Sequence, residues 1–203
     1  MTFLLLIRHG ENEYTRTGKL AGWTPEVHLN EAGQKQARAL AERLQPARLA
    51  AIYSSPLERA RETAEPLAEA KHLPIQILEG LGEVRYGQWQ GQSLKRLART
   101  KLWRVVQQHP SAMRFPGGET LRAVQARALE AVDEIVQRHP KKLVAAFSHG
   151  DVIKLLAAHY LGTPLDLFQR IVISTGSLTL VRLGAGQPVL VKLNDTGAMD
   201  WPH

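Results

Sequence analysis

Near its N-terminus the chain reads Leu4-Leu5-Leu6-Ile7-Arg8-His9-Gly10-Glu11, and the fold class can be worked out from this stretch. An apolar run that ends in a charged residue and a glycine is typical of a buried strand that enters a loop. The run Phe3–Ile7 spans five residues and stops at Arg8, so it is too short for a signal-peptide core or a membrane span. We therefore expect a cytoplasmic protein with no membrane partner.

Apolar patterns alternate between strand and helix outward from the expected strand at 2–7. Further strands are expected at 50–53, 75–78, 143–147, 171–174, 178–183 and 189–193, and helices at 31–45, 57–71, 121–139 and 152–161. Pro66 lies inside the second of these helices and predicts a kink or a break there. Residues 80–118 are irregular, with one or two short helices around 94–106. This order predicts an α/β fold with a mostly parallel sheet and an antiparallel edge.

Composition excludes several kinds of chemistry. The 203 residues contain no cysteine, which removes disulfide scaffolds, Cys-ligated metal centres and thiol nucleophiles. The strings typical of serine hydrolases, P-loop proteins, dinucleotide-binding proteins and zinc proteases are also absent. The chain length predicts a single domain spanning residues 1–203.

The positive charge of the chain is concentrated in one segment. The formal net charge is +7, and no acidic residue lies between Glu83 and Glu119. That interval holds seven cations: Arg85, Lys95, Arg96, Arg99, Lys101, Arg104 and Arg114. The concentration predicts a local surface that attracts anions, with a solvated helix face as the alternative. A nucleic-acid partner is not expected, because basic residues interleaved with stacking aromatics would then be required.

Two histidines occupy equivalent places, because His9 and His149 each follow an expected strand and precede a glycine. The carboxyl ends of parallel strands share one edge of a sheet, so both imidazoles can face one crevice. Phosphoryl transfer needs arginines for the phosphate oxygens, an unprotonated nucleophile and a carboxylic acid for the leaving group. Arg8, Arg59 and Glu83 complete such a set. Each of these residues taken alone could equally be an ordinary surface or core residue.

The candidate residues Arg8, His9, Arg59, Glu83 and His149 stand in motifs that follow one another in a specific order. The motifs are Leu5-Leu6-Ile7-Arg8-His9-Gly10-Glu11, Ser54-Ser55-Pro56-Leu57-Glu58-Arg59-Ala60-Arg61-Glu62-Thr63-Ala64, Glu83-Val84-Arg85-Tyr86-Gly87-Gln88-Trp89-Gln90-Gly91, Pro116-Gly117-Gly118-Glu119-Thr120 and Ser148-His149-Gly150. From residue 3 to about 180 the chain closely resembles the histidine phosphatase superfamily, in the branch of cofactor-dependent phosphoglycerate mutases and their phosphatase relatives.

The resemblance implies a role for each motif. His9 matches the histidine that becomes a phosphohistidine, and Glu83 matches the proton donor. The remaining expected site residues are Arg8, Arg59 and His149 around the phosphate, and Asn12, Gly22, Tyr86 and Gly150 in substrate binding. The resemblance also implies an α/β/α sandwich, a lid at 84–118 that sets specificity, and chemistry without a metal or organic cofactor.

The same resemblance separates a phosphatase from a mutase. Family mutases carry a fixed lysine where Leu94 stands, and Trp89-Gln90-Gly91 is the phosphatase-like form of its motif. Many relatives have Thr or Ser at the position of Asn12 and Asn at the position of Thr15. We expect a phosphatase acting on small phosphorylated metabolites that carry a second anionic group. A phosphomutase remains the alternative, and a non-catalytic phosphate-binding relative is disfavoured because His9 and Glu83 are both present. The sequence makes no prediction of the oligomeric state.

Overall fold

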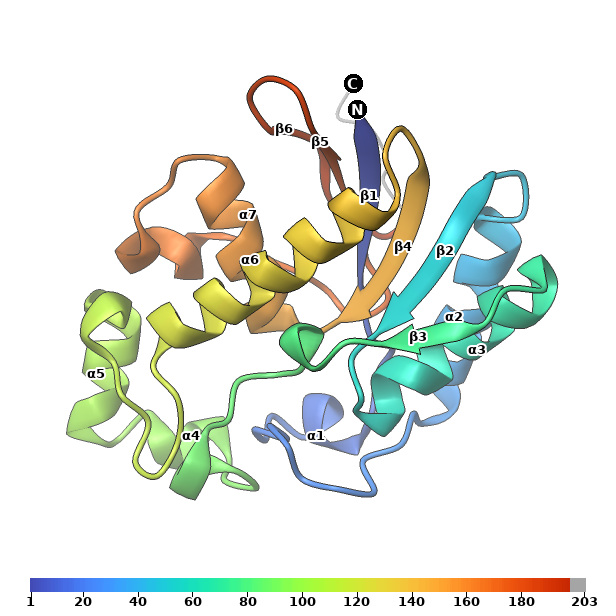
Figure 1. Cartoon of the computed structure of the whole chain (residues 1–203). Helices are drawn as coiled ribbons and strands as arrows, with labels where there is room; N and C mark the ends of the chain where they lie inside the picture. The colour runs from blue at the N-terminus through green and yellow to red at the C-terminus, as the bar shows by residue number, and fades with distance from the viewer. Residues whose placement is uncertain (198–203) are drawn as a thin grey trace, which may run out of the picture.

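The computed structural model describes residues 1–197 and is built on a six-stranded sheet in the order β3-β2-β4-β1-β5-β6 (Figure 1). The strands are β1 (Thr2–Arg8), β2 (Leu49–Ser54), β3 (Ile75–Ile77), β4 (Leu143–Ser148), β5 (Leu178–Leu183) and β6 (Val189–Asp195). β3, β2, β4 and β1 pair in parallel, whereas β5 is antiparallel to both β1 and β6. The predicted fold class is therefore confirmed, and its antiparallel part comprises two strands.

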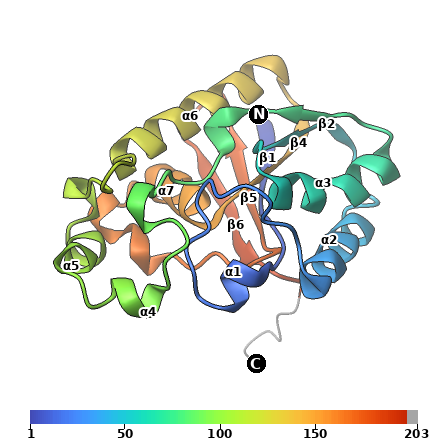
Figure 2. The same ribbon diagram turned by 90° about the horizontal axis from the view of Figure 1, so that it is seen from below.

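Helices cover both faces of the sheet, which makes a three-layer sandwich (Figures 1 and 2). α2 (Glu31–Arg43) and α3 (Glu58–Lys71) pack on one face against side chains such as Leu5 and Ile7. α6 (Leu121–Arg138) and α7 (Gly150–Tyr160) pack on the other face, against Leu4 and Leu6. Because β1 is buried on both faces, its sequence is a continuous apolar run instead of an alternating one.

Two expectations of local structure are wrong. Residues 171–174 form no strand: Ile171 and Ile173 are buried, but the neighbouring backbone is bound by side chains. Arg8 Nη1 donates to the Ile173 carbonyl at 2.6 Å, and the Ser174 amide donates to Asn194 Oδ1 at 2.6 Å. The apolar residues of this segment are therefore buried, but its backbone does not pair with a strand.

The second wrong expectation is the break at Pro66, which lies inside α3 without ending it. The helix is continuous on both sides of the proline, and Ala60, Ala64 and Leu67 on its inner face are fully buried. Proline removes one backbone hydrogen bond, but packing of an amphipathic face supplies most of the stability of a helix in a protein. Burial of this face therefore holds the helix together.

The carboxyl ends of β2 and β4 point toward α1 (Glu13–Arg16) and the irregular segment 84–118 (Figures 1 and 2). This segment contains α4 (Leu94–Leu97) and α5 (Lys101–Gln108), which confirms the short helices expected around 94–106. It also contains the 3-10 turns η2 (Gly87–Trp89) and η3 (Pro110–Ala112); two more, η1 (Glu79–Leu81) and η4 (Leu165–Arg170), lie outside it. No helix within residues 1–197 is long and apolar enough to cross a membrane.

Candidate active site

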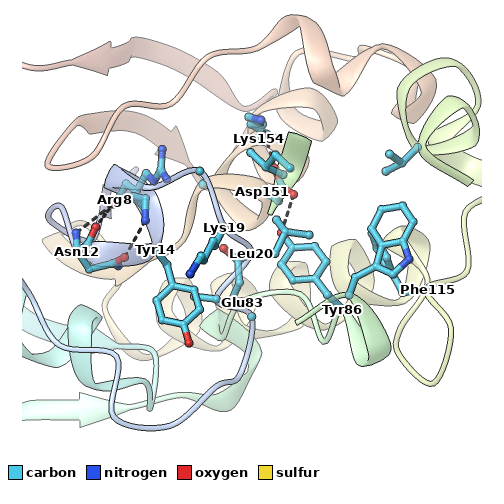
Figure 3. A pocket seen from close by; sticks show the side chains of 18 of the residues that line it. Arg8, Asn12, Tyr14, Lys19, Leu20, Glu83, Tyr86, Phe115, Asp151 and Lys154 are labelled. Atoms are coloured by element: carbon cyan, nitrogen blue, oxygen red, sulfur yellow. Dashed lines mark hydrogen bonds and ion pairs between the residues drawn. The ribbon is translucent and has the colours of Figure 1, made fainter. Parts of the chain in front are cut away.

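A cavity of about 290 Å³ opens beyond the carboxyl ends of the parallel strands (Figure 3). Its inner end is lined by Arg8 and His9 at the end of β1, Arg59 on α3, Glu83 after η1 and Gly150 at the start of α7. The sheet topology thus brings together residues that are up to 142 positions apart, from residue 8 to residue 150.

His9 is buried with its ring in a defined orientation. Its Nδ1 lies 2.7 Å from the carbonyl oxygen of Gly10, and a carbonyl can only accept, so Nδ1 carries the proton and donates it. Burial, followed by the charges of Arg59 and Arg8, lowers the pKa of His9 well below its ordinary value. Near neutral pH the ring is therefore neutral, and Nε2 has a free lone pair.

His149 lies beside His9, with the ring centroids 5.1 Å apart. Its Nε2 is 2.7 Å from Ser55 Oγ, and Ser55 Oγ also accepts from the Leu57 amide. Burial, Arg59 and the neighbouring His9 lower the pKa of His149 well below the ordinary value. When Ser55 donates to Nε2, the proton of the neutral ring lies on Nδ1, which is buried and has no partner within residues 1–197.

Two arginines supply positive charge to the same place. Arg59 is 1% exposed, and only its Nη2 is engaged, donating to the Gly22 carbonyl at 2.8 Å. Among the described residues, Arg59 Nε and Nη1 and Arg8 Nε are buried and have no hydrogen-bond partner. Burying a guanidinium without a carboxylate is costly. These donors suit an anion with several oxygens, such as a phosphate group.

Glu83 lines the cavity, as Asp151 does, and is 8% exposed. Its Oε1 accepts a hydrogen bond from the Val84 amide at 2.9 Å. Burial and the nearby negative charge of Asp151 raise the pKa of Glu83 to about 7, against the opposing effect of Arg59 and Arg8. The carboxyl group is therefore about half protonated near neutral pH, as a general acid requires.

The expected binding residues also line the cavity, and two of them are glycines with little space beside them. Gly22 has a φ of +54°, and a Cβ there would lie 2.8 Å from the side chain of Gln90. A Cβ at Gly150 would lie 3.2 Å from the guanidinium of Arg8. Tyr86 is buried in the wall, where its hydroxyl donates to Asp151 Oδ2 at 2.8 Å.

Asn12 and Thr15, where the chain differs from many relatives, bond to each other. Asn12 Oδ1 accepts from the Thr15 amide at 2.9 Å, and Thr15 Oγ1 accepts from the Asn12 amide at 3.0 Å. The pair caps the start of α1. Asn12 Nδ2 is buried without a partner in the described part of the chain, so it remains available as a donor at the cavity.

The sequence matches the model of the histidine phosphatase superfamily (branch 1) over residues 4–196. The chain belongs to this superfamily. Phosphoserine phosphatase 1 of Hydrogenobacter thermophilus is 31% identical to it over 198 residues, which are 97% of this chain and 93% of that protein. The metal-independent phosphoserine phosphatase of Arabidopsis thaliana is 33% identical over 161 residues, which are 77% of this chain and 67% of that protein. The structure of YhfR from Bacillus stearothermophilus superimposes with a TM-score of 0.90 at 34% identity, covering 96% of this chain and 98% of that one.

In this histidine phosphatase the segment 84–118 contributes apolar side chains to the cavity. Leu94, Trp103, Val106 and Phe115 line the outer wall, with Leu20 from the opposite loop. The seven cations of the segment are all exposed, and none of them lines the cavity. The expected excess of positive charge therefore lies on the outside of the segment. Arg85, for example, stacks on Trp23 with its Cζ 3.5 Å from the ring centroid.

Several residues of this histidine phosphatase site were not expected from the sequence. Ser55 binds His149, Thr63 Oγ1 accepts from the Gly10 amide at 2.9 Å, and Asp151 bonds Tyr86 and lies 3.2 Å from Lys154 Nζ. Ser55 and Thr63 stand inside the motif around Arg59, and Asp151 follows His149 and Gly150 directly. Their place in those motifs is the signal that could have identified them.

Proposed function

We propose that this histidine phosphatase hydrolyses phosphomonoesters through a phosphohistidine formed on His9. The observation that carries the proposal is the neutral His9 ring, whose Nδ1 is bound to the Gly10 carbonyl while buried guanidinium donors lie nearby. Nε2 attacks phosphorus, and the bond between phosphorus and the ester oxygen breaks. Arg8, Arg59 and His149 donate hydrogen bonds to the phosphoryl oxygens and stabilise the charge of the transition state.

Glu83 completes the reaction in this proposal. Its protonated carboxyl donates a proton to the departing alkoxide, and the resulting carboxylate accepts a proton from the water that attacks the phosphohistidine. The pKa of about 7 suits both steps, because the two forms of Glu83 are then close in free energy near neutral pH. A metal ion has no part in this scheme, which agrees with the metal-independent relative named above.

The alcohol part of the substrate, which departs as the leaving group, lies in the outer part of the cavity. Leu94, Trp103 and Val106 would contact its carbon skeleton, while Lys19 and Lys154 line the same cavity and can meet an anionic substituent. Small phosphorylated metabolites fit this mixed lining. A phosphomutase is disfavoured, because Leu94 supplies an apolar wall at the position where the mutases have lysine.

The test is phosphate release from a panel that includes phosphoserine, 3-phosphoglycerate, an alkyl phosphate and an aryl phosphate, for the native protein and His9→Ala. We expect release by the native protein only, and acid-labile labelling of the native protein alone by a ³²P-labelled substrate. Acid-labile label that persists in His9→Ala would refute the assignment. Isomerisation of 3-phosphoglycerate that exceeds phosphate release would show a mutase instead.

A further inference from the structure

A single guanidinium on α6 holds the loop that carries Glu83. Arg127 Nη1 donates to the carbonyls of Gly80 and Gly82 at 2.9 and 2.8 Å, and Nη2 donates to the carbonyl of Glu83 at 2.8 Å. Nε and Nη2 bind the two carboxylate oxygens of Glu119 at 2.8 and 3.0 Å. These bonds use all five N–H donors of the arginine.

The position of the Glu83 carboxyl depends on the backbone that Arg127 holds. The carboxyl is bound to the amide of the next residue, Val84, at 2.9 Å, so it moves with its own backbone. The Glu83 carbonyl also accepts from Trp23 Nε1 at 2.6 Å. Arg127 and Trp23 together therefore fix the peptide group between Glu83 and Val84, and the acid is placed through that peptide group.

Glu119 connects the arginine to the motif Pro116-Gly117-Gly118-Glu119. The Glu119 amide donates to the Arg85 carbonyl at 2.9 Å, and the Arg85 amide donates to Glu119 Oε2 at 2.8 Å. A Cβ at Gly118 would lie 2.1 Å from the Arg85 carbonyl oxygen, so only glycine allows this approach. The motif thus packs directly against the residues that follow Glu83.

We propose that Arg127, oriented by Glu119, is a positioning residue for the proton donor of the reaction. Arg127 is not among the residues that line the cavity, so its hydrogen bonds reach the substrate through Glu83 and not by direct contact. The inference rests on the proposed role of Glu83. Lysine cannot replace the arginine, because one ammonium nitrogen cannot present the planar fork that reaches the three carbonyls and the carboxylate at once.

The test compares leaving groups. Arg127→Lys should lower kcat/KM for an alkyl phosphate by about 10²-fold, the loss expected for an error of about 1 Å in the position of a catalytic group. The loss for p-nitrophenyl phosphate should be much smaller, because nitrophenolate leaves without a proton. Because kcat/KM reports only the steps up to formation of the phosphohistidine, the later hydrolysis by water, which is common to both esters, does not enter the comparison. Arg138→Lys is the matched control, since Arg138 lies on the same helix and pairs only with the half-buried Glu134 within the described residues.

Glu83→Gln and Glu119→Gln are assayed in parallel. Glu83→Gln should show the same selective loss, and if it does not, the proposed role of Glu83 is wrong. If Glu83→Gln is selective but Arg127→Lys slows both esters equally, Arg127 only stabilises the fold, and the positioning role is refuted. If Arg127→Lys does not fold, Glu119→Gln decides the question, because it replaces the carboxylate that orients the arginine with a neutral amide. A selective loss in Glu119→Gln supports the inference, and an equal loss refutes it.

Discussion

Replacement of Glu83 by glutamine removes the proposed proton donor while keeping the size of the side chain and its acceptor for the Val84 amide. Removing general-acid help costs about 10²–10⁴ in rate for an ester whose alkoxide must be protonated. The structure adds a pH dependence to this loss. With a pKa of about 7, Glu83 is about nine-tenths protonated at pH 6 and about one-tenth protonated at pH 8. The native rate limited by leaving-group protonation should therefore fall about tenfold over this interval.

The assay measures kcat/KM, which reports transfer of the phosphoryl group to His9, for an alkyl phosphate and for p-nitrophenyl phosphate from pH 5.5 to 8.5 in the native protein and Glu83→Gln. The substrate ionises in the same range, so the informative quantity is the ratio of native to variant rates for one substrate. For the alkyl ester this ratio should be large at low pH and fall as pH rises through about 7. A ratio that is independent of pH, or equal for the two esters, would show that Glu83 does not donate the proton.

Three further predictions follow from the site. Asp151→Asn removes the charge that helps to raise the pKa of Glu83, so the decline of the alkyl-ester rate should move to lower pH, as measured by the same profile; a shift upward or no shift would contradict this account. Activity should survive EDTA, and vanadate should inhibit competitively; loss of activity on chelation that is restored by Mg²⁺ or Zn²⁺ would contradict the mechanism. Reversing the three outer charges Lys95, Arg96 and Arg99 should lower kcat/KM for a bis-anionic ester at low salt and have little effect at 0.1 M salt, where screening acts over about 10 Å. An unchanged kcat/KM at low salt would mean that these cations only solvate the surface.

Much of the fold and the inner end of the site could be predicted, because each part is encoded by a short local pattern. The run before Arg8 identifies a strand buried on both faces, and the glycine after each histidine marks the strand-to-loop turn where His9 and His149 stand. Burial patterns alone, however, do not distinguish a paired strand from an extended buried segment, which is why 171–174 was assigned wrongly. The side-chain bonds that replace strand pairing there come from Arg8 and Asn194, far away in the sequence.

The charged segment 84–118 shows a second limit of sequence reasoning. The number of cations in the segment gives the right excess of positive charge. It does not show which side of a short helix faces the cavity. In α5 the cavity receives Trp103 and Val106, while Lys101 and Arg104 are exposed. Arg127 was missed for a related reason: it stands in an ordinary amphipathic helix, and its five hydrogen bonds reach the loop at 80–83 and Glu119 only in three dimensions.

The electrostatics of the site explain why Asp151 stands next to Glu83. Beside burial, the guanidinium groups that suit a phosphate also lower the pKa of His9, so one set of charges can both bind the substrate and keep the proposed nucleophile unprotonated. The same charges would ionise a nearby acid, because a cation favours the carboxylate. Burial and the charge of Asp151 outweigh them and keep the pKa of Glu83 near 7. Asp151 is itself bound by Tyr86 and Lys154, which hold the negative charge beside the acid. A neutral base and a protonated acid can therefore coexist within one cluster of positive charge.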